Sequence, residues 1–270
     1  MTQQGDKPKD KWASGDLYEP YVGRWSRRVA REFIEWLAVP DQRHWLDVGC
    51  GTGSLVAAIL EKASPLSVAG IDPSEGFLQF ARERVQDPRV SLEIGDAQAI
   101  PYNDNRFDTA VSGLVLNFIP EPERAVSEMA RVTKPGGTVA AYVWDYADKM
   151  ELMRYFWDAA IELNPEARSV DELKRFPNCK PEPLKKLLSS AGLAQVEARA
   201  IDVPTHFRDF DDYWGPFLGG QGPAPGYAMS LSEEDRVKLR DLIRSRLPTG
   251  EDGSISLIAR AWAVRGKKPE

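Results

Sequence analysis

The stretch that decides the fold of this 270-residue chain lies at residues 45–54 and reads WLDVGCGTGS. A short apolar run leads into three alternating glycines, Gly49, Gly51 and Gly53, and residues 55–62 follow with helical character. Because glycine lacks a Cβ, the backbone here can adopt positive φ and come close to a ligand. Strand, glycine loop and helix in this order predict the nucleotide-binding corner of a doubly wound α/β sheet.

Further predicted strands follow the glycine loop, and each ends in a polar residue. Residues 66–71 form one such strand, which ends at Asp72, and residues 90–94 and 107–112 form two more. Asp72 lies 19 residues beyond Gly53, close to the roughly 20-residue offset of an acid that binds ribose hydroxyls. Since the carboxyl ends of parallel strands share one edge, we expect these polar residues to line a common crevice.

The spacing of the glycines separates two kinds of adenosine-binding site. The dinucleotide fingerprint G-x-G-x-x-G needs a third glycine where this chain has Ser54 or Val56. A Walker loop is also excluded, because no G-K-[ST] follows the glycines. The chain instead has D-x-G-x-G-x-G from Asp47 to Gly53, then Asp72, and then Gly95-Asp96-Ala97.

This series of motifs resembles the class I S-adenosylmethionine-dependent methyltransferases, in particular the small-molecule branch described as type 11. The resemblance implies an α/β fold: a doubly wound, Rossmann-like seven-stranded sheet with an inserted helical lid over the substrate pocket. Residues 134–137 (KPGG) resemble the family's turn into a fifth strand at 138–144. Residues 191–197 resemble the beginning of the sixth strand, and residues 255–264 are expected to form the seventh.

The chain divides into three stretches on this interpretation. Residues 1–16 are polar and are predicted to be a disordered tail. Residues 17–145 are expected to hold the S-adenosylmethionine-binding core. This core includes an N-terminal helix over 25–37 with one buried apolar stripe, Trp25, Val29, Phe33 and Leu37. Residues 146–270 complete the same domain with the lid helices and the last two strands. The Gly- and Pro-rich stretch 219–226 is predicted to be a loop.

The resemblance also implies a role for each residue near the cofactor, S-adenosyl-L-methionine. Asp47 is expected to bind the methionine amino group, Asp72 the ribose hydroxyls, and Asp96 with Ala97 the adenine. Arg24 is expected to pair with the cofactor's carboxylate. The other predicted cofactor-binding residues are Tyr21, Gly49, Cys50, Gly51, Gly53, Pro73, Ser112 and Gly113.

Each of these acids and Arg24 also has a purely structural alternative. Asp47 could accept hydrogen bonds from backbone amides of its own turn. Asp72 could be the N-cap of a helix that has Pro73 at its first position. Asp96 could close an Asx-turn, and Arg24 could point into solvent at the start of a helix.

Residues outside these motifs supply the candidates for the methyl acceptor and for catalysis. Methyl transfer needs a general base only when the acceptor's pKa requires one. His44 begins the first strand, away from the crevice, and is predicted to be structural. The candidate substrate residues also have structural alternatives: the asparagine could cap a helix, and the aromatic residues could belong to the core. The predicted substrate-site residues are Asn117, Trp144, Tyr155 and Tyr213, and the candidate bases are Asp145 and His206.

Composition narrows the partners of such a site. The net charge of −6 argues against a nucleic-acid partner, since phosphate binding requires a basic face. No apolar run approaches the roughly 20 residues of a membrane span, and no secretory signal is recognisable. The two cysteines form no metal-binding or disulfide pattern, so we expect a cytoplasmic protein without a metal. We also expect a monomer or a homodimer.

The expected function is methyl transfer by in-line displacement to a small molecule. Cys50 is not favoured as a nucleophile, because the sequence places no histidine to activate it. Three alternatives remain. One is a non-catalytic protein that binds S-adenosylmethionine, and another is a NAD-type oxidoreductase, which the missing third glycine disfavours. The third is a methyltransferase acting on protein or nucleic acid.

Overall fold

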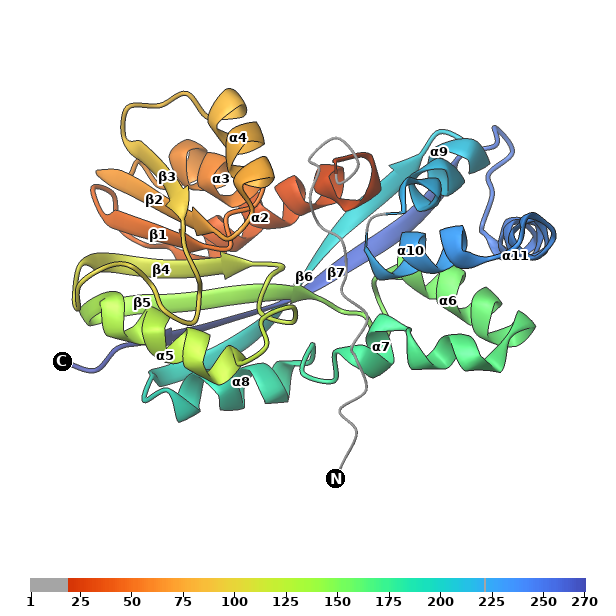
Figure 1. The fold of residues 1–270 in the computed structure, drawn as a ribbon. Helices are drawn as coiled ribbons and strands as arrows, with labels where there is room; N and C mark the ends of the chain where they lie inside the picture. The colour runs from red at the N-terminus through yellow and green to blue at the C-terminus, as the bar shows by residue number, and fades with distance from the viewer. Residues whose placement is uncertain (1–18, 221) are drawn as a thin grey trace.

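The computed structural model describes residues 19–220 and 222–270, which form a mixed seven-stranded sheet with helices on both faces (Figure 1). The strand order is β3-β2-β1-β4-β5-β7-β6, with β7 antiparallel to both its neighbours and the other pairs parallel. The predicted α/β fold is therefore confirmed. The strands are β1 (His44–Val48), β2 (Ser67–Asp72), β3 (Val90–Ile94), β4 (Phe107–Gly113), β5 (Thr133–Trp144), β6 (Ala194–Phe207) and β7 (Ile255–Lys267).

The helices of the core cover both faces of this sheet. α2 (Arg24–Leu37) packs on α3 (Ser54–Lys62), and α4 (Glu75–Arg84) lies beside them (Figure 1). α5 (Pro122–Val132) and α8 (Pro181–Ser190) pack together on the other face. The buried residues of α2 include the predicted apolar stripe, one residue in every four: Trp25, Val29, Phe33 and Leu37.

The order of the strands reverses at β1, which lies between β2 and β4. The chain leaves β1 through Gly53, whose φ of +81° is a conformation that glycine adopts without strain. On the other side, the Ser112 hydroxyl of β4 donates a 2.8 Å hydrogen bond to the Val48 carbonyl at the end of β1. Such a reversal leaves a crevice at the carboxyl ends of the two strands.

β6 and β7 continue past the end of β5 as a two-stranded ribbon. β5 pairs with β7 as far as Trp144 opposite Ala261, whereas β6 and β7 stay paired as far as Phe207 opposite Ile255. The ribbon carries a group of helices that we call the helical lobe (Figure 1). The lobe consists of α6 (Glu151–Leu163), α7 (Glu172–Arg175), α9 (Phe210–Trp214), α10 (Pro223–Ser230), α11 (Glu233–Arg246) and the short 3-10 helices η2 (Pro165–Ser169) and η3 (Gly215–Gly219).

The helical lobe has an aromatic core and is tied to the ribbon. The rings of Phe156 and Phe217 stack with centroids 4.6 Å apart. The Tyr213 hydroxyl donates to the Leu152 carbonyl at 2.8 Å, and the Glu151 carboxylate accepts from the Ile258 amide at 2.7 Å. The first two contacts lie within the lobe and the third joins it to β7, while its action as a lid stays a prediction.

Two local predictions need correction, and one lies outside the description. Residues 223–226 are not a loop, because Pro223 begins α10: proline suits the start of a helix, where its fixed φ fits and no amide is needed. The predicted turn at 134–137 lies inside β5, where the register against β4 shifts. The predicted tail, residues 1–16, falls outside the described residues.

Within residues 19–220 and 222–270, no helix combines the length and the apolar character that crossing a membrane requires.

Two glycines give a matched test of this packing. A Cβ on Gly137 would lie 2.7 Å from the Asp108 carbonyl oxygen and 2.8 Å from that of Lys134. Because backbone atoms cannot move aside cheaply, Gly137→Ala should lower the free energy of unfolding by about 1–3 kcal/mol. A Cβ on Gly226 in α10 would meet open space, so Gly226→Ala should be neutral or stabilising by up to about 1 kcal/mol. Urea unfolding measures both, and equal losses would contradict this packing.

Candidate functional site

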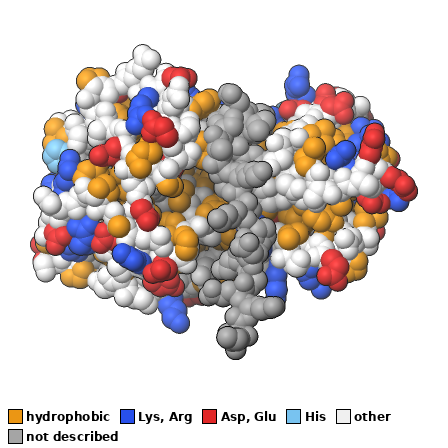
Figure 2. All heavy atoms as spheres, viewed as in Figure 1, with side chains coloured by type: hydrophobic (Ala, Val, Ile, Leu, Met, Phe, Trp, Pro, Cys, Tyr) orange, Lys and Arg blue, Asp and Glu red, His pale blue; other side chains and the backbone are white. Residues whose placement is uncertain are grey.

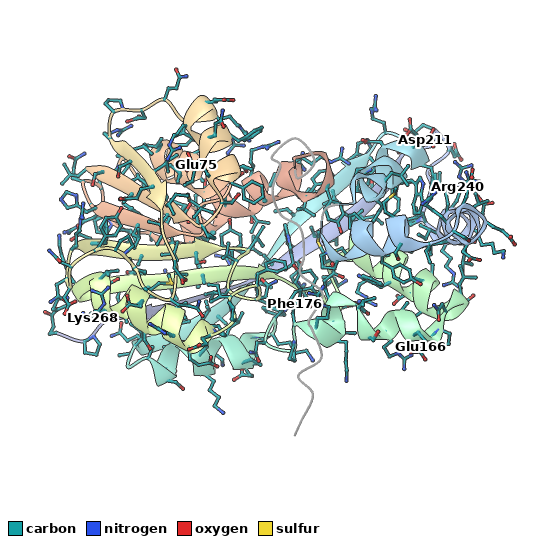
Figure 3. The ribbon with its side chains drawn as sticks, viewed as in Figure 1. Glu75, Glu166, Phe176, Asp211, Arg240 and Lys268 are labelled. Atoms are coloured by element: carbon teal, nitrogen blue, oxygen red, sulfur yellow. The ribbon has the colours of Figure 1, made fainter. Side chains whose placement is uncertain are left out.

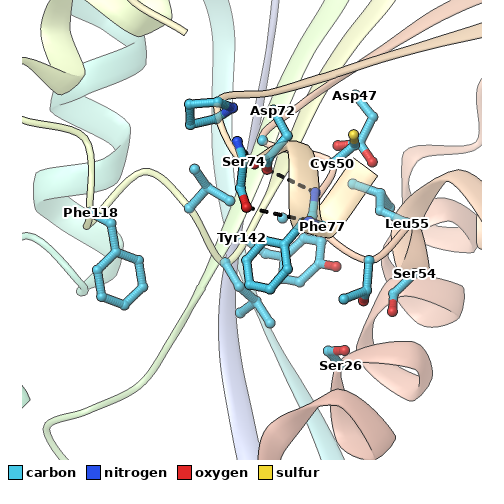
Figure 4. A pocket seen from close by; sticks show the side chains of 17 residues that line it. Ser26, Asp47, Cys50, Ser54, Leu55, Asp72, Ser74, Phe77, Phe118 and Tyr142 are labelled. Carbon is cyan, nitrogen blue, oxygen red and sulfur yellow. Dashed lines mark hydrogen bonds between the residues drawn. The ribbon is translucent and has the colours of Figure 1, made fainter. Parts of the chain in front are cut away.

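A cavity of about 230 Å³ opens at the carboxyl ends of β1, β2 and β4, where the strand order reverses (Figure 4). This is the place that ligands take in open α/β sheets. Its walls also include residues that the sequence analysis did not identify, among them Ser26, Phe77 and Tyr142. The predicted cofactor-binding residues that line it are Asp47, Gly49, Cys50, Gly51, Asp72, Pro73 and Gly113.

The glycine loop forms the wall of this cavity next to β1. The amides of Gly49 and Cys50 both donate to the Ile71 carbonyl, at 2.8 and 3.0 Å, so the loop is fixed to the end of β2. Gly51 has a φ of +50°, and a Cβ built on it would meet no atom within 4 Å. At Gly51 the backbone therefore borders open space, and a ligand can approach it closely.

Asp72 is held by backbone amides at the end of β2. Its carboxylate accepts from the Gly51 amide at 3.0 Å and from the Ser74 amide at 2.8 Å. Burial raises the pKa of Asp72, and these two hydrogen bonds oppose the shift. The alternative of Asp72 as a helix N-cap is wrong, because Ser74 caps α4 by accepting from the Phe77 amide.

Asp47 is fully buried, and neither of its carboxylate oxygens has a hydrogen-bond partner among the described residues. The alternative in which Asp47 binds amides of its own turn is therefore wrong. Burial, with a smaller contribution from the Asp72 charge, raises the pKa of Asp47 to about 8. An unpaired carboxylate on a cavity wall is suited to a cationic group of a ligand, which would stabilise its ionised form.

Cys50 also lines the cavity, and its thiol is buried. Burial raises the pKa of this thiol well above its usual value, and the charges of Asp47 and Asp72 add to the effect. Because the thiolate is the reactive form of cysteine, this environment keeps Cys50 unreactive.

Gly113 lies at the end of β4, directly beneath a tyrosine of β5. A Cβ on Gly113 would come within 2.6 Å of the Tyr142 hydroxyl, so only glycine fits beside that side chain. Ser112 does not line the cavity, and its hydroxyl is used in the bond to β1. Gly53 also lies outside the lining, at the start of α3.

Tyr21 lies in the short π-helix η1 (Glu19–Gly23), Arg24 is the first residue of α2, and neither lines this cavity. Tyr21 is buried against Phe217 of the lobe, with ring centroids 5.5 Å apart. The Arg24 guanidinium donates to the Asp212 carboxylate at 3.1 Å and packs over Trp25, 4.5 Å from its centroid. Arg24 thus already has a carboxylate partner within the chain, and its pairing with a cofactor stays a prediction.

Asp96 and Ala97 follow β3 and are not among the residues that line the cavity. Asp96 is exposed, and its carboxylate accepts from the Gln98 amide at 2.8 Å, which closes an Asx-turn. The structural alternative for Asp96 is thus present, and its contact with adenine stays a prediction.

A second, smaller chamber of about 20 Å³ adjoins the cavity, since Leu114 and Phe118 line both. Its walls come from the core and from the helical lobe, and they include the predicted substrate residue Trp144. They also include Glu172 of α7, a buried acid that the sequence analysis missed because no motif surrounds it. Only the tertiary fold brings Glu172 to the site.

The remaining substrate and catalytic candidates do not line either of these two spaces. Tyr213 is buried in the lobe, Tyr155 is partly exposed on α6, and both amide atoms of Asn117 are buried without a hydrogen-bond partner among the described residues. Asp145 accepts from the Ala147 amide at 3.2 Å, and His206 is exposed near Ser256. The two catalytic assignments stay predictions.

His44 lies at the start of β1, and its Nδ1 is 2.8 Å from the Ser67 hydroxyl, which agrees with a structural role. Among the described residues, no group of three or more His, Cys, Asp or Glu side chains is arranged to hold a metal ion.

Residues 46–141 match the family model described as "Methyltransferase domain". This matched stretch, residues 46–141, is a methyltransferase domain, in agreement with the resemblance to the class I S-adenosylmethionine-dependent methyltransferases. A demethylmenaquinone methyltransferase of Symbiobacterium thermophilum is 36% identical over 121 residues, which cover 43% of this chain and 48% of that protein. The chain thus spans about half the length of the curated relatives it matches.

Solved structures extend the likeness beyond the matched residues at the level of the fold. A Bacillus halodurans C-125 protein with a provisional methyltransferase assignment has a TM-score of 0.61 and 20% identity, covering 89% of this chain and 99% of that one. Phosphoethanolamine N-methyltransferase 2 of Haemonchus contortus, solved with S-adenosyl-L-methionine, has a TM-score of 0.56 and 17% identity. The matched region covers 92% of this chain and 53% of the Haemonchus contortus chain.

Burial of Asp47 predicts a pH dependence of stability. The pKa of Asp47 is near 8 in the folded chain and about 4 in the unfolded chain. Its contribution to the free energy of unfolding is therefore complete below pH 4 and is lost as the pH rises toward 8. The loss is about 1.4 kcal/mol per pH unit for one proton. Asp47→Asn should remove this contribution. In urea unfolding, the free energy of unfolding of the wild type should therefore fall more between pH 5.5 and pH 7.5 than that of the variant.

A surface acid with the opposite shift is the control. Hydrogen bonds from Arg89 lower the pKa of Asp87 to about 2, so Asp87 is ionised in both states across this pH range. Asp87→Asn should therefore shift stability equally at both pH values. Parallel curves for the wild type and Asp47→Asn would show that Asp47 is ionised in the free protein.

Proposed function

We propose that this chain transfers a methyl group from S-adenosyl-L-methionine to a small-molecule acceptor. The observation that carries the proposal is the unpaired, buried carboxyl of Asp47 on the wall of a glycine-bordered cavity. S-adenosylmethionine carries an ammonium, a sulfonium and a ribose but no phosphate. Its binding therefore calls for carboxylates, close backbone approach and few fixed cations.

The residues present fit that group. Asp47 would pair with the ammonium, and Asp72 would accept from the ribose hydroxyls with the lone pairs that its two amide contacts leave free. The open space beside Gly51 would admit the backbone-facing edge of the ligand. None of the described residues that line the cavity is Lys or Arg, so no wall residue would repel a sulfonium.

When bound, S-adenosylmethionine supplies an electrophilic methyl group, and the chain's own task is to align an acceptor with it and exclude water. Much of the acceleration in such a displacement can come from alignment in a dry cavity. The chamber between core and lobe adjoins the cavity and is bordered by apolar side chains, which supports an acceptor path there. We infer that the helical lobe acts as the lid of this path.

A small molecule is the acceptor that the surface supports best. The net charge is −6, which is unfavourable for nucleic acid, and the chamber is enclosed by side chains of both core and lobe. The relative from Symbiobacterium thermophilum, named for demethylmenaquinone, supports a small apolar acceptor without identifying it.

Calorimetric titration tests the donor site. S-adenosylmethionine and its demethylated product, S-adenosylhomocysteine, should both bind, whereas NAD should not. Asp72→Ala should weaken both by at least tenfold, about 1.4 kcal/mol, because the ribose loses its acceptor. Glu83→Ala, on the exposed side of α4, is the matched control and should bind like the wild type.

Failure of the folded wild type to bind either compound would overturn the proposed function. Donor binding without methyl release across a panel of phenols and amines would favour the non-catalytic alternative. Binding of NAD instead would favour the oxidoreductase.

A further inference from the structure

The small chamber beside the donor cavity is built from both halves of the molecule. Leu114, Phe118 and Trp144 belong to the core, whereas Met153, Glu172 and Pro223 belong to the helical lobe. Every one of these side chains except Glu172 presents mainly apolar surface. Val22 and Tyr146 complete the described lining, so the chamber is mainly apolar, with one carboxyl and one phenol among its lining residues.

Two side chains of α6 hold this carboxyl in place. Arg154 pairs with Asp171, with contacts of 2.9 and 3.1 Å, and so fixes the residue that precedes Glu172. One turn further on, the Trp157 indole donates a hydrogen bond to Oε2 of Glu172. Residues three apart lie on the same face of a helix, so α6 positions the start of α7 from one side.

The other oxygen of Glu172 is left without a partner. Oε1 is buried and has no hydrogen-bond partner among the described residues, and the same is true of the nearby Tyr21 hydroxyl. A buried polar group that stays unpaired costs free energy. A group that donates a proton to Oε1 would remove that cost.

The size of the chamber sets what it can hold. A space of about 20 Å³ accommodates roughly one water-sized group. It is therefore large enough for the head group of a ligand, and Leu114 and Phe118, which line both spaces, place that group beside the donor cavity. No Lys or Arg is among the described residues that line the chamber, so an anionic head group would be repelled.

We propose that this chamber binds the head group of the methyl acceptor, a hydroxyl or an ammonium on an apolar body, and that Oε1 of Glu172 takes its proton. The inference rests on the proposed methyl transfer. The O–H or N–H bond breaks, its electron pair stays on the acceptor atom as the nucleophilic lone pair, and the carboxylate becomes a carboxylic acid. Glu172 thus becomes the candidate base in place of Asp145 and His206.

The electrostatics of Glu172 agree with this role. Burial raises its pKa to about 8, and the neighbouring Asp171 charge adds to the shift. Hydrogen bonds from its own backbone amide and from Trp157 oppose the shift, as does the Arg175 charge. A carboxylate with a pKa this high is a much stronger base than an exposed one. It is better matched to phenols and amines, because proton transfer is most efficient between groups of similar pKa.

The test uses three probes of similar size: phenol, benzylamine and anisole, of which anisole has no acidic proton. Each is titrated at pH 8.5, above the pKa of Glu172, into the full chain with and without saturating S-adenosylhomocysteine, and binding is followed by ligand-observed NMR. Wild type is compared with Glu172→Gln, whose amide oxygen can still accept from Trp157. Glu166→Gln, an exposed acid of the lobe (Figure 3), is the matched control.

We expect phenol or benzylamine to bind the wild type and Glu166→Gln at least about tenfold more tightly than anisole, and Glu172→Gln to lose this preference. S-adenosylhomocysteine should bind all three proteins equally, so its failure to bind would reject the donor site and not the chamber. The proposal is overturned if the probes do not bind, if anisole binds as tightly as the others, or if the preference survives in Glu172→Gln. In the first case the chamber holds a structural water at most, and in the other two Glu172 does not select the ligand.

Discussion

The reversal of strand order at β1 is the constraint on which the site depends. β1 bonds to β2 on one side and to β4 on the other, and the segments that follow these strands leave an opening at their carboxyl ends. The Ser112 hydroxyl fixes β4 to β1, and the amides of the glycine loop fix β1 to β2. Residues distant in sequence, such as Asp47 and Gly113, therefore meet on one cavity.

Two buried carboxyls have strongly raised pKa values, and they line the donor cavity and the adjoining chamber. Asp47 and Glu172 each have a pKa raised to about 8 by burial, without a paired cation. Other buried acids are satisfied: Asp171 by Arg154 and Asp145 by backbone amides. Each unpaired acid reduces stability at neutral pH, and a proton-donating or cationic ligand would offset that cost. Figure 2 shows that charged side chains otherwise lie scattered over the surface of both halves.

The sequence predicted the features formed by neighbouring residues and missed those formed by residues far apart in the chain. The glycine loop, Asp72 and the α2 stripe follow from spacing within a few turns, and the structure places them as expected. Pro223 was assigned to a loop because glycine and proline composition does not distinguish a loop from a helix that begins at proline. The chamber was not predictable, because its walls run from Val22 to Pro223 and no spacing rule connects them.

The division between the matched and unmatched parts of the chain has a functional consequence. The family match ends at residue 141, so it includes the donor cavity's glycine loop and Asp72 but not the helical lobe. Glu172, Met153 and Pro223 all lie beyond it, and they form the lobe side of the chamber. On the proposed function, the part shared with known methyltransferases would bind the donor, and residues outside the matched stretch would contact the acceptor. Among the described residues, Met153, Glu172 and Pro223 line only the chamber, and the two spaces share only Leu114 and Phe118. Replacing the lobe residues should therefore change which acceptor binds without changing the affinity for the donor.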